Sequence, residues 1–238
     1  MSRAITIARR EFLSYLFSPI AYVAMTLFLL VAGILFRKDF EPGQPAAMRT
    51  IFDWMVWLLV FIVPLLCMGL LAQEWASGTI ESLMTAPVGE TDVVLGKFLG
   101  SLMLFILLVV PTLFYVVLLR IYSRPDYGPI FSGYLGILLV GALFIAIGLF
   151  CSSLTRSQIV AAVTTSAILF AVTILPWWAA GEATLAGFWR TVADQTVFRR
   201  YTDFSKGVID LGNLVFFIAA TAVFLFLTVK VLESRRWK

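Results

Sequence analysis

The chain of 238 residues contains no histidine, only two cysteines and few charged side chains, which make up 13% of the sequence. Histidine is the commonest general base and a frequent metal ligand, so its absence argues against most acid-base and metal sites. No segment matches the G-x-x-x-x-G-K-[ST] loop that binds nucleotide phosphates. We therefore expect no catalytic site, no cofactor and no metal in this chain. Cys67 and Cys151 lie in apolar runs, where a cysteine serves as a small hydrophobic side chain.

Hydrophobic residues make up 61% of the chain, whereas soluble domains have about 45–50% apolar and about 25% charged residues. A soluble enzyme is excluded, because too few polar side chains remain to cover its surface. The net charge of +4 could suggest nucleic acid. However, basic residues scattered around apolar runs more often reflect membrane topology. The composition predicts an integral membrane protein that binds lipid and no nucleic acid.

Six charge-free runs approach the roughly 20 apolar residues that a helix needs to cross a bilayer. They are residues 19–36, 54–72, 98–119, 134–154, 159–179 and 214–229. We predict one all-α membrane domain over residues 1–238 with six transmembrane helices. The runs contain no ionisable residue for a proton or ion relay. Asp53 and Lys97 stand beside two runs, where we interpret Asp53 as offsetting a helix dipole and Lys97 as an interfacial anchor.

Residues 1–18 predict an amphipathic helix at the membrane surface rather than a secretory signal, because Arg9, Arg10 and Glu11 interrupt any apolar core. Ile7 and Arg9 fit the amphipathic pattern poorly. The predicted apolar face comprises Ile5, Ala8, Phe12, Tyr15 and Leu16, and the polar face comprises Arg3, Arg10 and Ser14.

Six spans would place both termini on one side of the membrane. Lysine and arginine divide evenly between the two sides, so their totals do not decide the orientation. Their density does, because the end of the chain contains Lys230, Arg235, Arg236 and Lys238. Basic residues close to spans favour the cytoplasm, so we expect cytoplasmic termini.

Two connections are too long to be simple turns. Residues 73–97 form an acidic loop, with Glu74, Glu81, Glu90 and Asp92. Residues 181–213 mix aromatic and charged side chains, which suggests short amphipathic helices that lie at the membrane interface or pack over the end of the bundle opposite the termini.

The acidic loop contains a second candidate helix. Glu81 follows Gly78 by three residues, which predicts a helix with Gly78 as its N-cap, and Pro87 would end it. Ile80, Leu83 and Met84 would share a face suited to a groove on another protein. The alternative is an interfacial helix with this face in lipid. Two small-residue motifs, Gly96-x-x-x-Gly100 and Gly148-x-x-x-Ser152, are candidates for close helix packing, including packing against a second copy.

The segment Glu74-x-x-x-Gly78-Thr79-Ile80-Glu81-x-Leu83-x-x-x-Pro87, followed by Gly96-Lys97-Phe98, resembles the coupling-helix signature of ABC transporter permeases of the type-2 exporter family. The opening Arg9-Arg10-Glu11-Phe12-Leu13-Ser14-Tyr15-Leu16-Phe17-Ser18-Pro19-Ile20-Ala21-Tyr22 is similar to the subclass first named for gliding motility. The resemblance extends over the whole chain.

The resemblance implies an exporter subunit in the cytoplasmic or inner membrane that works by alternating access. A separate ABC ATPase dimer would bind at the cytoplasmic face and hydrolyse ATP with Mg²⁺. Residues 1–18 would be the connecting helix, 73–97 the coupling loop and 181–213 an external helical region. Within the ATPase cleft, Glu74 and Glu81 would make polar contacts, and Ile80, Leu83 and Met84 apolar ones. The implied coupling residues are Glu74, Gly78, Thr79, Ile80, Glu81, Leu83, Met84 and Pro87.

The resemblance also implies a second membrane subunit. This is either another copy of the permease or a related protein, in some systems one with an extracytoplasmic auxiliary domain. Two other functions compete with transport. A non-transporting assembly or scaffold protein could use the same cytoplasmic helix to recruit a partner. A membrane-embedded hydrolase or transferase is the weakest alternative, because its nucleophile would have to act without histidine.

Overall fold

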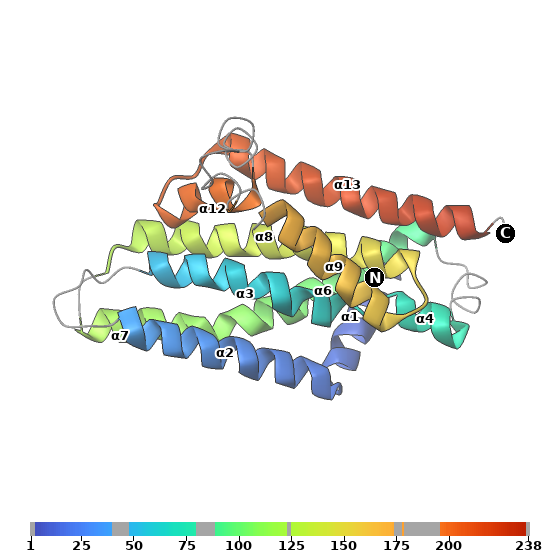
Figure 1. Cartoon of the computed structure of the whole chain (residues 1–238), viewed down its shortest axis with the longest axis horizontal. Coiled ribbons are helices and arrows are strands. Elements are labelled where there is room, and N and C mark those ends of the chain that lie inside the picture. Colours follow the sequence, from blue (N-terminus) through green and yellow to red (C-terminus); the bar gives the residue numbers. More distant parts are fainter. Residues whose placement is uncertain are drawn as a thin grey trace.

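The computed structural model describes residues 3–39, 48–79, 89–122, 125–173, 178 and 196–236. Every regular element in these ranges is a helix, and the long helices run side by side along the long axis (Figure 1). The elements are α1 (Arg3–Leu16), α2 (Pro19–Asp39), α3 (Arg49–Cys67), α4 (Ala72–Ser77), α6 (Glu90–Val109), a 3₁₀ turn (Val110–Thr112), α7 (Leu113–Tyr122), α8 (Tyr127–Leu154), α9 (Gln158–Thr173), α12 (Val197–Ser205) and α13 (Leu211–Arg236).

Five helical segments are long and apolar enough to cross a membrane. They are Pro19–Lys38, Arg49–Ser77, Glu90–Tyr122, Tyr127–Leu154 and Leu211–Ser234. They contain all predicted runs except the fifth, residues 159–179. There the described helix α9 has 16 residues, which at 1.5 Å per residue reach about 24 Å, short of a bilayer core of about 30 Å. The structure therefore confirms five candidate spans, and part of the fifth predicted run lies outside the described residues.

The helices extend beyond the charge-free runs from which they were predicted. Helix α6 begins at Glu90, so Lys97 lies inside the helix and not at its start. Glu90 and Asp92 occupy its first turn, where carboxylates interact favourably with the positive end of the helix dipole. Asp53 likewise lies inside α3, which begins at Arg49. A charge ends an apolar run, but it does not end a helix.

Helix α8 is the centre of the bundle. In the most apolar stretch of α8, 72% of the residues are buried, whereas in that of α13 only 17% are. Gly133 and Gly141 explain how neighbours approach it so closely, because a Cβ atom at either position would overlap a phenylalanine ring, Phe52 of α3 and Phe105 of α6 respectively. Rings thus occupy the space that side chains on α8 would need.

Large apolar side chains stay exposed on the outer helices. Such a surface is unstable in water but suits a lipid environment. Examples on α2, α7, α9 and α13 are Val23, Ile34, Ile121, Ile159, Val163, Val215 and Phe226.

Helix α12 lies within the predicted segment 181–213 and packs on α8. Its Phe204 is buried, and the Phe204 carbonyl accepts a hydrogen bond of 2.7 Å from the hydroxyl of Ser132. Helix α12 lies at the opposite end of the bundle from α4 and the C-terminal end of α13 (Figure 1). Residues 181–195 lie outside the described ranges.

Candidate functional site

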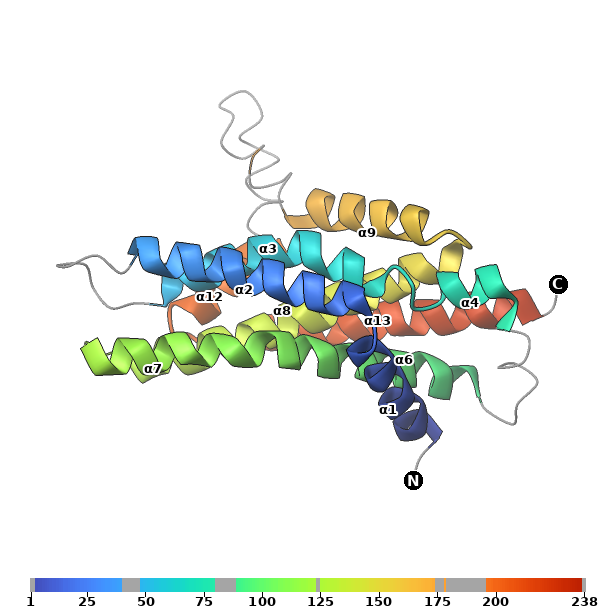
Figure 2. The ribbon, with the colours of Figure 1, turned by 90° about the horizontal axis from the view of Figure 1, so that it is seen from below.

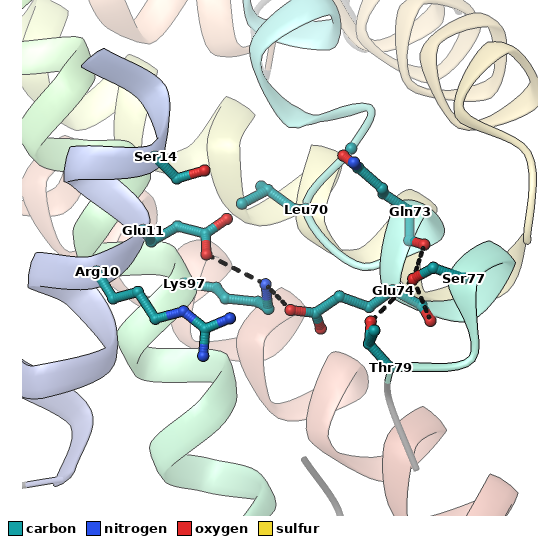
Figure 3. A pocket seen from close by; sticks show the side chains of 10 residues that line it. Arg10, Glu11, Ser14, Leu70, Gln73, Glu74, Ser77, Thr79 and Lys97 are labelled. Carbon is teal, nitrogen blue, oxygen red and sulfur yellow. Dashed lines mark hydrogen bonds and ion pairs between the residues drawn. The ribbon is translucent and has the colours of Figure 1, made fainter. Parts of the chain in front are cut away.

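A buried ion pair network joins α1, α4 and α6. The Nζ atom of Lys97 lies 2.8 Å from Oε1 of Glu74 and 3.3 Å from Oε2 of Glu11, and we call these three residues the charged cluster (Figure 3). The Lys97 side chain is 3% exposed, and the two glutamates are 24% and 21% exposed. The prediction of Lys97 as an interfacial anchor is therefore wrong. Its ammonium group is held inside the protein by two carboxylates.

The helix pair that carries the cluster is brought together by glycine. A Cβ atom at Gly96 would lie 2.6 Å from Cβ of Ile7, and one at Gly100 would lie 2.7 Å from Cβ of Glu11. The motif Gly96-x-x-x-Gly100 thus packs α6 against α1 of the same chain. Close approach of the two backbones places Glu11 beside Lys97.

This packing divides the predicted apolar face of α1 into a buried part and an exposed part. Ala4 and Ala8 are buried, and Ile7, which did not fit the predicted pattern, faces Gly96. Ile5, which belongs to the same predicted apolar face as Ala8, is 45% exposed. Small residues form the contact because only they allow two helices to approach so closely.

Tyr15 fastens the end of α1 to the end of α3. Its hydroxyl donates a hydrogen bond of 2.8 Å to the Leu66 carbonyl and lies 3.5 Å from Oγ of Ser101. Burial raises the pKa of Tyr15 well above its usual value of 10.0. The hydroxyl therefore stays neutral and remains a donor at physiological pH.

A second contact fixes the turn between α3 and α4 to α8. The Ser152 hydroxyl accepts hydrogen bonds of 3.0 Å from the backbone N–H groups of Leu71 and Ala72 and donates one of 3.2 Å to the Met68 carbonyl. The first N–H groups of a helix have no partner within it, so Ser152 supplies an acceptor at the start of α4. The second small-residue motif, Gly148-x-x-x-Ser152, therefore also packs within the chain, since a Cβ at Gly148 would lie 2.6 Å from Cβ of Cys67.

Replacing Ser152 with alanine is expected to lower the free energy of unfolding by about 2 kcal/mol, because buried N–H groups lose their acceptor. Ser153→Ala is the matched control. Ser153 is also buried, but its hydroxyl bonds only the nearby Phe150 carbonyl. Thermal melting of both purified variants measures the difference. Equal melting temperatures would contradict a special role for Ser152.

Gly78 ends α4. Helix α4 covers Ala72–Ser77, and Gly78 follows as its C-cap with φ 72° and ψ 0°. This left-handed conformation suits glycine, which is strongly favoured after the last residue of a helix. The helix predicted to begin at Gly78 would run into residues 80–88, which lie outside the described ranges, so the assignment of Gly78 as its N-cap stays a prediction. Thr79 follows and is exposed.

Five other predicted coupling residues lie outside the described ranges. These are Ile80, Glu81, Leu83, Met84 and Pro87. Glu74 is described, and its Oε1 atom is turned toward Lys97, while no described group forms a hydrogen bond with its buried Oε2 atom. Glu11, which belongs to the same cluster, escaped the sequence prediction. Two features of the sequence point to it: Glu11 is the single acidic residue of α1, and the glycines on either side of Lys97 allow another helix to approach the lysine closely.

A polar pocket of about 380 Å³ lies beside the charged cluster (Figure 3). Its lining includes Glu74 and Thr79, two of the predicted coupling residues. In the described ranges, no group of three or more His, Cys, Asp or Glu residues could hold a metal ion. The pocket is lined by Arg10, Glu11, Ser14, Gly69, Leu70, Gln73, Glu74, Ser77, Thr79 and Lys97.

Comparison with known proteins assigns the family. The family model described as ABC-2 family transporter protein matches residues 40–232, which is most of the chain. No curated protein matches the sequence. Membership of this family implies an ABC ATPase as a partner in general. The apolar helices and this match together show that the chain belongs to the ABC-2 transporter family and is a membrane permease component of an ABC transporter.

Proposed function

We propose that this permease is an exporter driven by a separate ABC ATPase, and that the ATPase acts on the segment after α4. This segment comprises residues 78–88. The ATPase binds and hydrolyses ATP with Mg²⁺, and the permease moves substrate by alternating access. The termini and the charged cluster then lie on the cytoplasmic side.

The attachment of α4 is the observation that carries this proposal. Helix α4 is tied to α8 through Ser152 and to α6 and α1 through Lys97. Its far end, at Gly78, leads directly into the predicted coupling segment. A force on this segment would therefore reach three other helices through short polar contacts.

The ATPase can shift the bundle between two conformations only if its contacts with the two conformations differ in free energy. ATP-driven closure of the ATPase dimer supplies these differential contacts. The charged cluster supports a transfer of movement, because the two carboxylates and the ammonium group must move together or lose a buried ion pair.

The finer assignments follow the same resemblance. Residues 9–22 are similar to the subclass first named for gliding motility. The permease then pairs in the membrane with a second copy of itself or with a related subunit, including one with an extracytoplasmic auxiliary domain. Helix α1 corresponds to the connecting helix of the family and α12 to part of its external region.

The proposal is tested with Glu81→Ala and Gly78→Pro. Proline cannot adopt the positive φ of Gly78, and alanine removes the predicted polar contact. We expect each variant to reduce affinity for the ATPase by about ten-fold, equivalent to about 1.4 kcal/mol. Co-purification and ATP hydrolysis in lipid nanodiscs provide the measurement. Glu233→Ala is the control for Glu81→Ala, because it removes an exposed carboxylate of α13.

Full transport by both variants would overturn the coupling role. ATP hydrolysis that increases with substrate would exclude the scaffold function. A partner that binds the segment but hydrolyses no ATP would favour it.

A further inference from the structure

The face of α1 that points away from the bundle carries an arginine within an apolar line. Ile5, Arg9 and Leu13 are spaced by four residues and so lie above one another along the helix. Ile5 is 45% and Leu13 is 42% exposed, and Arg9 is also exposed. Phe17, just beyond the helix, is 86% exposed. These four residues together require surroundings that accommodate both apolar side chains and a positive charge.

The charged cluster makes this outer face more basic than the sequence suggests. Glu11 is the single acidic residue of α1, and its carboxylate is turned inward to Lys97. Arg9 and Arg10 are exposed, and neither forms an ion pair with a described residue. The cation at Arg9 therefore lacks a carboxylate partner within the described part of the chain.

The position of α1 places this face near the membrane boundary. Helix α1 is followed after Phe17 and Ser18 by α2, a candidate membrane span. It is inclined across the long helices (Figure 2). At this depth the available anion is a lipid phosphate, and a guanidinium group can bind phosphate through two parallel hydrogen bonds.

We propose that the outer face of α1 binds anionic phospholipids. The Arg9 guanidinium binds the phosphate group, and Ile5, Leu13 and Phe17 insert at the boundary between headgroups and acyl chains. The negative surface charge of anionic lipid favours it over zwitterionic lipid with the same phosphate. This lipid site requires no ATPase and so is independent of the proposed function.

The test measures which lipids stay with the protein. The full-length permease is placed in nanodiscs of equimolar phosphatidylcholine and phosphatidylglycerol, extracted in neutral detergent and analysed by mass spectrometry. We expect wild-type protein to retain phosphatidylglycerol preferentially. Arg9→Gln is expected to reduce this preference about five-fold, the effect of one basic residue at an anionic surface, whereas Arg9→Lys should retain part of it.

Arg156→Gln is the matched control, because it removes one exposed positive charge between α8 and α9. It should retain the wild-type preference. Equal melting temperatures of wild type and Arg9→Gln in pure phosphatidylcholine would show that the variant is folded. This is expected, since the Arg9 side chain is exposed.

Unchanged lipid retention by Arg9→Gln would overturn the proposal, and so would an equal loss in Arg156→Gln. An unchanged lipid preference with weaker ATPase binding in pure phosphatidylcholine would assign this face to the ATPase instead. Failure of the wild-type permease to bind any ATPase would contradict the proposed function but leave the lipid result intact.

Discussion

Replacing Lys97 with methionine is expected to lower the free energy of unfolding by about 3 kcal/mol, near the lower end for breaking a buried ion pair. The substitution leaves two carboxylates, Glu11 and Glu74, facing a site that has lost its ammonium group. Both glutamates are partly exposed, at 21% and 24%, so water reduces the cost. We also expect α1 to separate from α4. Trypsin cleavage after Arg9 or Arg10 should become faster, and thermal melting should shift to lower temperature.

A triple variant separates charge from packing. Lys97→Met combined with Glu11→Gln and Glu74→Gln removes all three charges and keeps side chains of similar size. It should recover much of the lost stability, because replacing a whole buried ion pair network is often nearly neutral. If Lys97→Met alone melts like the wild type, the network does not hold α1. If the triple variant is no more stable than Lys97→Met, packing rather than charge is responsible.

Replacing Gly100 with leucine is expected to detach α1 from α6 and cost about 3 kcal/mol of stability, the upper end of typical overpacking effects. A Cβ atom at Gly100 would lie 2.7 Å from Cβ of Glu11 and 2.9 Å from the Ala8 carbonyl oxygen. The obstruction includes backbone, so no rotation of a side chain can relieve it. Leucine favours helix over glycine by less than about 1 kcal/mol, which does not offset the clash.

Gly212→Leu is the matched control, since the nearest atom to a Cβ there is a side-chain oxygen of Asp210 at 3.4 Å. It should melt close to the wild-type temperature. The distance between spin labels attached to α1 and α6, measured by electron paramagnetic resonance, reports detachment directly. An unchanged distance in Gly100→Leu, together with unchanged melting, would show that the two helices are less tightly packed than the structure indicates.

The length of apolar runs predicted the long helices well, because the bilayer thickness sets a minimum that short core segments do not meet. It could not predict where those helices begin. Lys97 interrupts the run at Phe98, yet α6 starts at Glu90. The pairing of Lys97 with Glu11 and Glu74 depends on contacts between segments that are far apart in the sequence. A local sequence pattern does not predict such contacts.

Amphipathic periodicity placed Ile5 and Ala8 together on one apolar face of α1. It did not distinguish the side chains that face lipid from those that contact another helix. Beside a membrane, large apolar residues can face lipid, while small residues allow helices to touch. Ala4 and Ala8 therefore face α6, and Ile5 and Leu13 stay exposed.

The charged cluster also has a consequence for how the protein is made. A lysine inserted near the membrane without counterions would be costly. Glu11 and Glu74 both precede Lys97 in the chain, so the ribosome synthesises both carboxylates before the ammonium group that they bind. The carboxylates that pair with Lys97 are therefore already present in the chain when Lys97 is made, and no later segment is needed to supply them.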